Sequence, residues 1–338
     1  MAQPQSSAWL KAELAREHPE LATAYGRPGL YTFKSRGGAL PLDFVPRTVF
    51  ARHFGFSVGP AGGFADVRRL LEGCPSRLRL HVYARDEGEG CLIASTAQLE
   101  ETRLGILSAS SDQFHDDTTP NAGDLVLDVI VPPSSDPAEP WFIGWHRHVV
   151  GRSTRPGAIG RQTPPSHAPS RAWSKLEELL LWSGLRLKAG HRAVEIGCAP
   201  GGAVVNLLDR GLHVTGIDPG EMAPHIAEYA EGSSGTFAHL QLPAAGVARE
   251  QLPAVVDWLL CDANLAPTVT LRYLAHWSKQ LRPKLRGILF TLKLNDERML
   301  RALPKLLSRC GELGFGPARA VQLPSHRQEV AVACARLR

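Results

Sequence analysis

Residues 193–202 read Ala-Val-Glu-Ile-Gly-Cys-Ala-Pro-Gly-Gly, and the architecture of the C-terminal half can be inferred outward from them. An apolar strand ends at Gly197, a glycine-containing turn follows, and a helical run begins near Val204. Glycine lets the backbone approach a ligand closely, and the first N–H groups of a helix have no partners within it. A second strand ends at Asp218, where a carboxylate can accept both hydroxyls of a ribose. The pattern predicts a nucleotide-type site, although it is not the Gly-x-Gly-x-x-Gly of pyrophosphate binders.

Alternating strands and helices surround this motif. Before it, Ser170 is a plausible N-cap and Gly184 can end the helix, whose apolar stripe consists of Trp173, Leu176, Leu179 and Leu180. Strands are predicted at residues 193–197, 213–218, 237–242, 257–261, 287–292, 318–322 and 329–335. The alternation predicts an α/β fold with a mostly parallel sheet covered on both faces. The last two strands are joined too closely for a crossover, so the last strand should pair antiparallel.

Residues 1–150 show a different pattern, a mixture of short helical and strand segments. A helix is predicted at 65–72 and strands at 77–85, 124–131 and 140–149, which together indicate a small α+β region. This region contains no motif for chemistry. With 338 residues, the chain is longer than a single core usually supports, so two or more domains are expected.

Residues 151–169 are rich in proline and glycine and are predicted to be a linker. The sequence from 140 to 175 contains no Asp or Glu, and it carries the basic residues Arg147, Arg152, Arg155, Arg161 and Arg171. The segment is either a solvated connector that happens to be basic or a strip that contacts the phosphates of a nucleic acid.

Composition excludes several classes of protein. The net charge of +5 permits a polyanionic partner without requiring one. No apolar run is long enough to span a bilayer, and charged residues interrupt any signal-peptide core near the N-terminus, so we expect a cytoplasmic protein without membrane contact. The six cysteines form no CxxC pair and do not cluster with histidines, so neither a disulfide framework nor a zinc site is expected.

Four segments together resemble a known family. They are Ser-Arg-Ala-Trp-Ser-Lys-Leu-Glu-Glu at 170–178, Glu-Ile-Gly-Cys-Ala-Pro-Gly-Gly at 195–202, Cys-Asp at 261–262 and Thr-Leu-Lys-Leu at 291–294. They resemble the FtsJ-type RNA 2'-O-ribose methyltransferases, and residues 156–178 look like the junction in the M-type branch, the 23S rRNA (cytidine-2'-O) methyltransferases. The resemblance implies a Rossmann-like class I methyltransferase sheet at 170–338, S-adenosylmethionine as cofactor, and a THUMP-like RNA-binding region at 1–150.

The resemblance also implies site residues. The family's Lys–Asp–Lys–Glu tetrad falls on Lys175, Asp262, Lys293 and Glu329. Taken singly, each is more readily a surface charge or a helix cap, but all four occur in the right order with the glycine motif. The implied cofactor-binding residues are Glu195, Gly197, Cys198, Ala199, Pro200, Gly201, Gly202, Asp218 and Asp262.

The expected function is methyl transfer from S-adenosylmethionine to a ribose 2'-hydroxyl of RNA, with 23S rRNA or its precursor as partner. Lys293 is either the general base or the group that steers a lone pair of the hydroxyl while water takes the proton. No metal is expected in the reaction, because the sulfonium already activates the methyl group. Transfer RNA, a small-molecule acceptor and a non-catalytic RNA-binding role remain alternatives, and the oligomeric state is left open.

Overall fold

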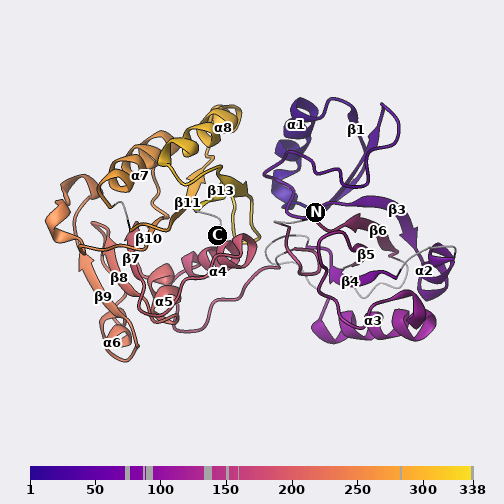
Figure 1. Ribbon diagram of the computed structural model, residues 1–338, viewed down its shortest axis with the longest axis horizontal. Coiled ribbons are helices and arrows are strands. Elements are labelled where there is room, and N and C mark those ends of the chain that lie inside the picture. The colour runs from indigo at the N-terminus through magenta and orange to yellow at the C-terminus, as the bar shows by residue number, and fades with distance from the viewer. Residues whose placement is uncertain are drawn as a thin grey trace. The chain divides into compact units, whose positions relative to one another are not determined.

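The computed structural model describes all residues except 73–76, 87, 89–93, 133–138, 150–151, 159, 282–283 and 336–338. The chain divides into two compact units, Met1–Gly160 and Arg161–Arg338, and the division falls inside the predicted linker (Figure 1). Cys74 and Cys91 lie outside the described residues, and the described cysteines are buried free thiols at Cys198, Cys261, Cys310 and Cys334. Within the described ranges, no helix combines the length and the apolar character needed to cross a membrane.

The C-terminal unit is built on a seven-stranded sheet with the order β12-β13-β11-β10-β7-β8-β9. Its strands are β7 (Arg192–Ile196), β8 (His213–Ile217), β9 (Thr236–Leu240), β10 (Trp258–Cys261), β11 (Gly287–Lys293), β12 (Arg319–Val321) and β13 (Glu329–Ala335). All neighbours are parallel except β13, which is antiparallel to β11 and β12. The predicted mostly parallel sheet with an antiparallel last strand is confirmed.

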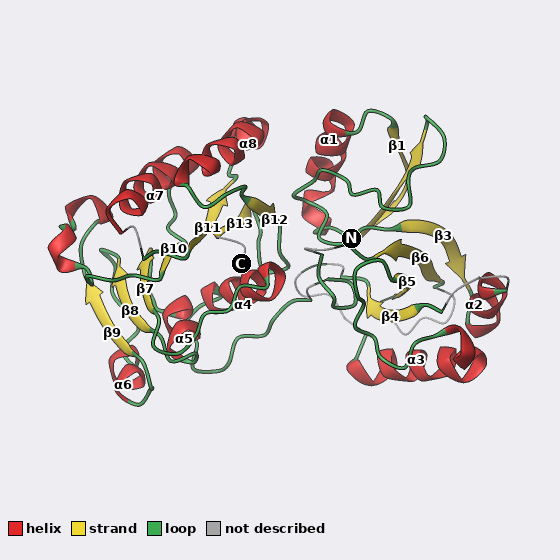
Figure 2. Cartoon of the chain, viewed as in Figure 1, coloured by secondary structure: helices red, strands yellow, loops and turns green. Residues whose placement is uncertain are grey.

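Helices cover both faces of this sheet, as Figure 2 shows. They are α4 (Ala172–Ser183), α5 (Gly202–Leu208), α6 (Ile226–Glu231), α7 (Pro267–Leu281) and α8 (Glu297–Cys310). The apolar stripe of α4 at Leu176, Leu179 and Leu180 packs with the fully buried α5 against one face, and α7 contacts the other. The predicted start of α4 is wrong by one residue: Arg171 is the N-cap, and Ser170 Oγ accepts the Ala172 N–H at 3.3 Å.

The strand order reverses between β7 and β10. From β7 the chain continues to β8 and β9 on one side of the sheet, and it then returns to β10 and β11 on the other. In open α/β sheets, ligands bind beyond the carboxyl ends of the strands at such a reversal. The turn at 197–202 and the residues that follow β10 both lie at this edge.

The N-terminal unit contains a four-stranded sheet with the order β3-β6-β5-β4 and a separate β1-β2 hairpin. Its strands and helices are α1 (Ser7–Glu17), β1 (Leu21–Arg27), β2 (Leu30–Ser35), β3 (Phe56–Ala61), α2 (Phe64–Leu71), β4 (Arg79–Ala84), α3 (Thr96–Ser110), β5 (Leu125–Val131) and β6 (Trp141–Arg147). Short 3₁₀ helices complete the two units at Pro4–Ser6, Ser111–Gln113, Ala244–Gly246, Arg249–Gln251 and Gly311–Leu313. The predicted helix and three strands are present, whereas α1, α3 and β1 to β3 were not predicted.

Candidate active site

The structure brings two amines and two carboxylates together at the carboxyl edge of the sheet. Lys175 Nζ lies 3.2 Å from Asp262 Oδ2 and 2.7 Å from Glu329 Oε1. Lys293 Nζ lies 2.7 Å from Asp262 Oδ1 and also donates to Glu329 Oε2. Each lysine therefore contacts both carboxylates, and the four side chains are between 8% and 18% exposed. We call this arrangement the tetrad.

Strand register explains why residues so distant in sequence meet. Lys293 and Glu329 are direct partners in the antiparallel pair of β11 and β13, so their side chains leave the same face. Asp262 directly follows β10, whose last residue Cys261 pairs with Phe290 of β11. Lys175 comes from the buried side of α4, the helix that covers these strand ends.

The ion pairs set the protonation states of the tetrad. Burial alone would lower the pKa of Lys293, but the carboxylates of Asp262 and Glu329 outweigh it and hold the pKa above its usual value. Burial would raise the pKa of Asp262, and the charges of Lys175 and Lys293 lower it instead. The pKa of Glu329 is lowered against burial by His326, Lys175 and Lys293. At neutral pH the tetrad thus contains a protonated Lys293 and two ionised carboxylates.

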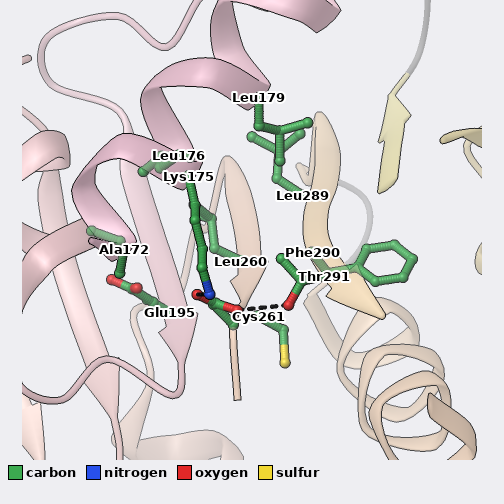
Figure 3. Close-up of a pocket in the computed structure, with 12 residues that line it drawn as sticks. Ala172, Lys175, Leu176, Leu179, Glu195, Leu260, Cys261, Leu289, Phe290 and Thr291 are labelled. Carbon is green, nitrogen blue, oxygen red and sulfur yellow. Dashed lines mark hydrogen bonds and ion pairs between the residues drawn. The ribbon is translucent and has the colours of Figure 1, made fainter. Parts of the chain in front are cut away.

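Thr291 also contacts the tetrad, and the sequence did not single it out. Its Oγ1 donates to Asp262 Oδ1 at 2.6 Å. Figure 3 shows Lys175 extending from α4 between Glu195 on one side and Thr291 on the other. The three residues line a cavity of about 30 Å³. Thr291 lies two residues before Lys293 on β11, so period-2 alternation could have identified it.

Glu195 supplies a further carboxyl group at this edge. Its side chain is buried, and its Oε2 has no hydrogen-bond partner among the described residues. Burial, together with the nearby charges of Asp262 and Asp218, raises the pKa of Glu195 well above its usual value. A buried carboxyl of this kind favours a cationic ligand, because an ammonium or sulfonium would offset the cost of ionising it.

Asp218 stabilises the turn that follows β7 by accepting two backbone hydrogen bonds. Its Oδ2 accepts the Ala199 N–H at 3.2 Å, and its Oδ1 accepts the Gly220 N–H at 2.7 Å. The same turn contains the cis Ala199–Pro200 peptide bond and Cys198, whose Sγ lies 3.8 Å from Met222 Sδ. The structure therefore places the carboxylate of Asp218 beside the glycine turn, at the same edge of the sheet as the tetrad.

The glycines of this turn are required by the chain itself. Gly197 has φ +86°, and a Cβ there would lie 2.6 Å from the backbone nitrogen of Ala263. A Cβ on Gly202 would lie 2.3 Å from Ser170 Oγ. The sequence explained these glycines by the approach of a ligand, but the structure shows that they allow the turn after β7 to pack against the segment after β10 and the start of α4.

Glu178 connects α4 to the segment before β13, and it too was missed. Its Oε2 accepts the Ser325 N–H at 2.8 Å, and its Oε1 accepts the Ser325 hydroxyl at 2.7 Å. Glu178 lies almost one turn after Lys175 on α4, and Ser325 precedes Glu329 by four residues. This contact fixes the helix that carries one tetrad residue to the segment that delivers another. No local pattern in the sequence indicates it.

The arginines predicted to contact RNA are not equivalent. Arg147 Nη1 donates to the Gly123 carbonyl at 2.9 Å, and Arg155 is exposed. Arg152 donates to the Phe54 carbonyl, and its guanidinium lies 4.1 Å from the centre of the Phe54 ring. Arg152 thus packs inside the N-terminal unit, which differs from the predicted solvent-facing strip. Arg161 and Arg171 belong to the C-terminal unit.

Strand order, glycine turn and tetrad define the C-terminal unit as a Rossmann-like class I methyltransferase domain. Residues 168–298 match the FtsJ-like methyltransferase family. The matched range includes Lys175, Asp262 and Lys293 and ends before Glu329.

Curated relatives bear the name Ribosomal RNA large subunit methyltransferase M. The proteins from Thauera aminoaromatica and Halorhodospira halophila are 35% identical over 193 residues and 34% identical over 185 residues. These alignments cover 53% and 54% of this chain and 49% and 51% of the relatives, so the chain spans about half the length of the curated relatives it matches. A solved structure of Aeropyrum pernix fibrillarin with S-adenosyl-L-methionine is 17% identical, with a TM-score of 0.37 over 49% of this chain and 76% of that one.

Proposed function

We propose that this protein transfers a methyl group from S-adenosylmethionine to a ribose 2'-hydroxyl of RNA, with large-subunit rRNA as its substrate. The observation that carries the proposal is the tetrad, in which two lysines and two carboxylates form a closed set of ion pairs beside the glycine turn. The names of the curated relatives support rRNA as the substrate. A cytoplasmic location follows from that substrate and is part of the proposal.

The residues at the sheet edge fit this cofactor. The unpartnered buried carboxyl of Glu195 suits a cationic group, and Asp218 offers a carboxylate to ribose hydroxyls. The N–H groups at the start of α5 suit the carboxylate of an amino acid. Residues 197–202, with Asp262, complete the proposed binding set. When bound, the cofactor supplies a methyl group that its sulfonium has already activated.

The tetrad would then act on the acceptor hydroxyl. Because the pKa of Lys293 is raised, its ammonium group is the form present at neutral pH, and an ammonium cannot accept a proton. Of the two roles predicted for Lys293, we therefore favour orientation: the ammonium donates a hydrogen bond to the 2'-oxygen and holds a lone pair in line with the methyl group. The proton of the hydroxyl leaves to water. Asp262 and Glu329 hold both lysines in place and keep Lys293 charged.

This role predicts a level pH profile. The raised pKa of Lys293 keeps its ammonium until pH rises above the ordinary lysine value of about 10.4, and the lowered pKa values of Asp262 and Glu329 keep them ionised until pH falls below about 4. We expect kcat/KM for methyl transfer to vary less than about threefold between about pH 6 and 9. A tenfold rise per pH unit through this range would show that a deprotonated Lys293 is needed, and would contradict the orienting role.

The proposal also assigns RNA binding to the N-terminal unit. The predicted THUMP-like character of this unit stays a prediction, as does the involvement of Arg147, Arg155, Arg161 and Arg171 in phosphate contacts. Of these four, Arg155 and Arg171 are exposed, and Arg147 and Arg161 are half-buried. Arginines that reach solvent suit such contacts because they neutralise phosphate charge and release counterions, which makes binding sensitive to salt.

Methyl transfer to defined RNAs tests the function. The full chain is incubated with methyl-labelled S-adenosylmethionine and, separately, large-subunit rRNA from a strain lacking the gene, total tRNA, and a small-molecule acceptor. We expect label in the rRNA, recovered as a 2'-O-methylnucleoside by mass spectrometry. Label in tRNA alone, in the small molecule alone, or in no acceptor would refute the proposed substrate and would favour the corresponding alternative. Matching rRNA that already carries the modification should accept little label.

A further inference from the structure

The sheet of the N-terminal unit has a polar centre on the face that is turned away from α2 and α3. Leu127 and Val129 belong to the apolar core, so Asp128 between them on β5 points to the opposite face. On that face, the neighbouring strands contribute His81 from β4 and His146 from β6, while His53 comes from the segment before β3. All four side chains belong to residues that are at most 5% exposed.

Three imidazole nitrogens converge on the one carboxylate. His53 Nε2 lies 3.1 Å from Asp128 Oδ1, His146 Nδ1 lies 2.5 Å from Asp128 Oδ2, and His81 Nδ1 lies 4.0 Å from Asp128 Oδ1. The strand register accounts for this convergence. His81 is the direct partner of Asp128 in the parallel pair of β4 and β5, and His146 is displaced by two residues across β5 and β6.

The contacts of the His81 ring place a lone pair of its Nδ1 against the Asp128 carboxylate. Its Nε2 lies 2.9 Å from the Thr118 carbonyl oxygen, which can only accept, so Nε2 carries the proton. In the neutral ring, Nδ1 then presents a lone pair to another acceptor, Asp128 Oδ1. Nδ1 is buried and has no hydrogen-bond partner in the part of the chain that the structure describes. Two facing acceptors repel each other, and a cation between them would remove that repulsion. A carbonyl behind the ring is the usual outer partner of a metal-binding histidine.

A neighbouring positive charge limits the identity of that cation. The Arg152 guanidinium, held by the carbonyl and the ring of Phe54, lies near enough for its charge to act on this centre. A proton on His81 would place a second buried positive charge near Arg152, and Asp128 Oδ1, which would offset it, lies 4.0 Å away and already contacts His53 Nε2. A metal ion also adds positive charge, but it forms bonds to all four groups at once, and the Asp128 carboxylate offsets part of its charge.

We propose that His53, His81, Asp128 and His146 bind a Zn²⁺ ion that stabilises the N-terminal unit. Three imidazoles and one carboxylate form a closed four-coordinate set of the kind that zinc accepts, with metal–ligand distances of about 2.0–2.2 Å. The ligand atoms of His53, Asp128 and His146 all lie within 4.8 Å of one another, and His81 Nδ1 lies 4.0 Å from Asp128 Oδ1. A modest adjustment of the side chains would bring the four groups to the roughly 3.3 Å spacing of tetrahedral zinc ligands. No zinc site was expected from the sequence, because its histidines do not cluster with its cysteines.

The test measures zinc directly in the full chain, prepared without a histidine tag. Wild-type protein from zinc-supplemented growth should contain about one zinc ion per chain by mass spectrometry of the metal. After the metal is removed with a chelator, a competition titration with ZnCl₂ should restore about one equivalent, and the added zinc should raise the Tm. His81→Gln should weaken zinc binding at least about tenfold and remove the rise in Tm.

Two further variants make the result decisive. His146→Gln removes a second proposed ligand and should also lose zinc, so the proposal stays testable if His81→Gln does not fold. His276→Gln changes an exposed histidine of the C-terminal unit and should bind zinc as the wild type does. Failure of the stripped wild type to take up zinc, or unchanged binding by both ligand variants, would overturn the site. The cluster would then be a hydrogen-bonded network around Asp128. Methyl transfer is not part of the readout, so this result is independent of the proposed function.

Discussion

Lys293→Ala is expected to reduce the rate of methyl transfer by about 10²–10⁴-fold, the range typical for loss of a group that assists proton transfer or orients the nucleophile. Lys293 is the amine held by both Asp262 and Glu329 at the end of β11, and alanine removes the only atom proposed to contact the 2'-oxygen from that side. The effect should fall on kcat, because the cofactor is proposed to bind chiefly through Glu195, Asp218 and the turn after β7. Single-turnover transfer to rRNA measures the reaction, and calorimetry measures the affinity for S-adenosylmethionine. Together they separate an effect on the reaction from an effect on cofactor binding.

Folding must be checked in the same experiment. Without Lys293, two buried carboxylates share only Lys175, which destabilises the site. Lys293→Met, which keeps most of the side-chain volume, should show the same kinetic loss with less disturbance of packing. Lys305→Ala removes an exposed lysine of α8 and should leave the rate unchanged. If a folded Lys293→Ala or Lys293→Met protein retains more than about a tenth of wild-type turnover, its assigned role is wrong.

Asp218→Ala is expected to weaken binding of S-adenosylmethionine by about ten- to a hundredfold, since hydrogen bonds to a charged group contribute about 1.5–3 kcal/mol. The carboxylate is proposed to accept the ribose hydroxyls, and it also holds the turn through Ala199 and Gly220. Both effects act on the cofactor, so the dissociation constant from calorimetry is the quantity to compare. The rate at saturating cofactor should change much less than the dissociation constant.

Asp218→Asn distinguishes the two contributions. Asparagine can keep one acceptor for the backbone N–H groups but loses the charge, so it should bind the cofactor with intermediate affinity. Glu250→Ala, at an exposed position in the same unit, should bind as the wild type does. An unchanged dissociation constant in folded Asp218→Ala would show that the ribose is held elsewhere.

The two halves of the chain differ in how well their sequences predict their folds. In the C-terminal unit, every predicted strand is present within two residues at each end. Strands buried on both faces have long apolar runs, and each is separated from the next by a helix or a turn. In the N-terminal unit, α3 was missed because Gly105 interrupts it and only Thr102 and Ile106 are buried. Strand β3 contains Gly59 and Pro60, residues that disfavour a strand assignment.

The residues of the site likewise divide into those that were predicted from the sequence and those that were not. The resemblance supplied Lys175, Asp262, Lys293 and Glu329, and the structure places them together, whereas their catalytic roles stay predictions. Thr291 and Glu178 were not predicted. Glu178 and Ser325 are 147 residues apart, and no spacing rule connects them. Arg152 was expected to face solvent, but it packs on Phe54, since a charge count does not reveal which way a side chain turns.

In the C-terminal unit, the sequence by itself determined the order of the strands, the glycine turn after a strand and the identity of the groups that could do chemistry, because these depend on local periodicity and residue type. Only the tertiary structure decided which charges meet. The pairing of Lys293 with Glu329 depends on the register of β11 and β13, and the convergence of His53, His81 and His146 on Asp128 depends on three adjacent strands and the segment that precedes them. Register and strand order are set by the packing of the whole sheet, so contacts between distant residues cannot be read from any one segment.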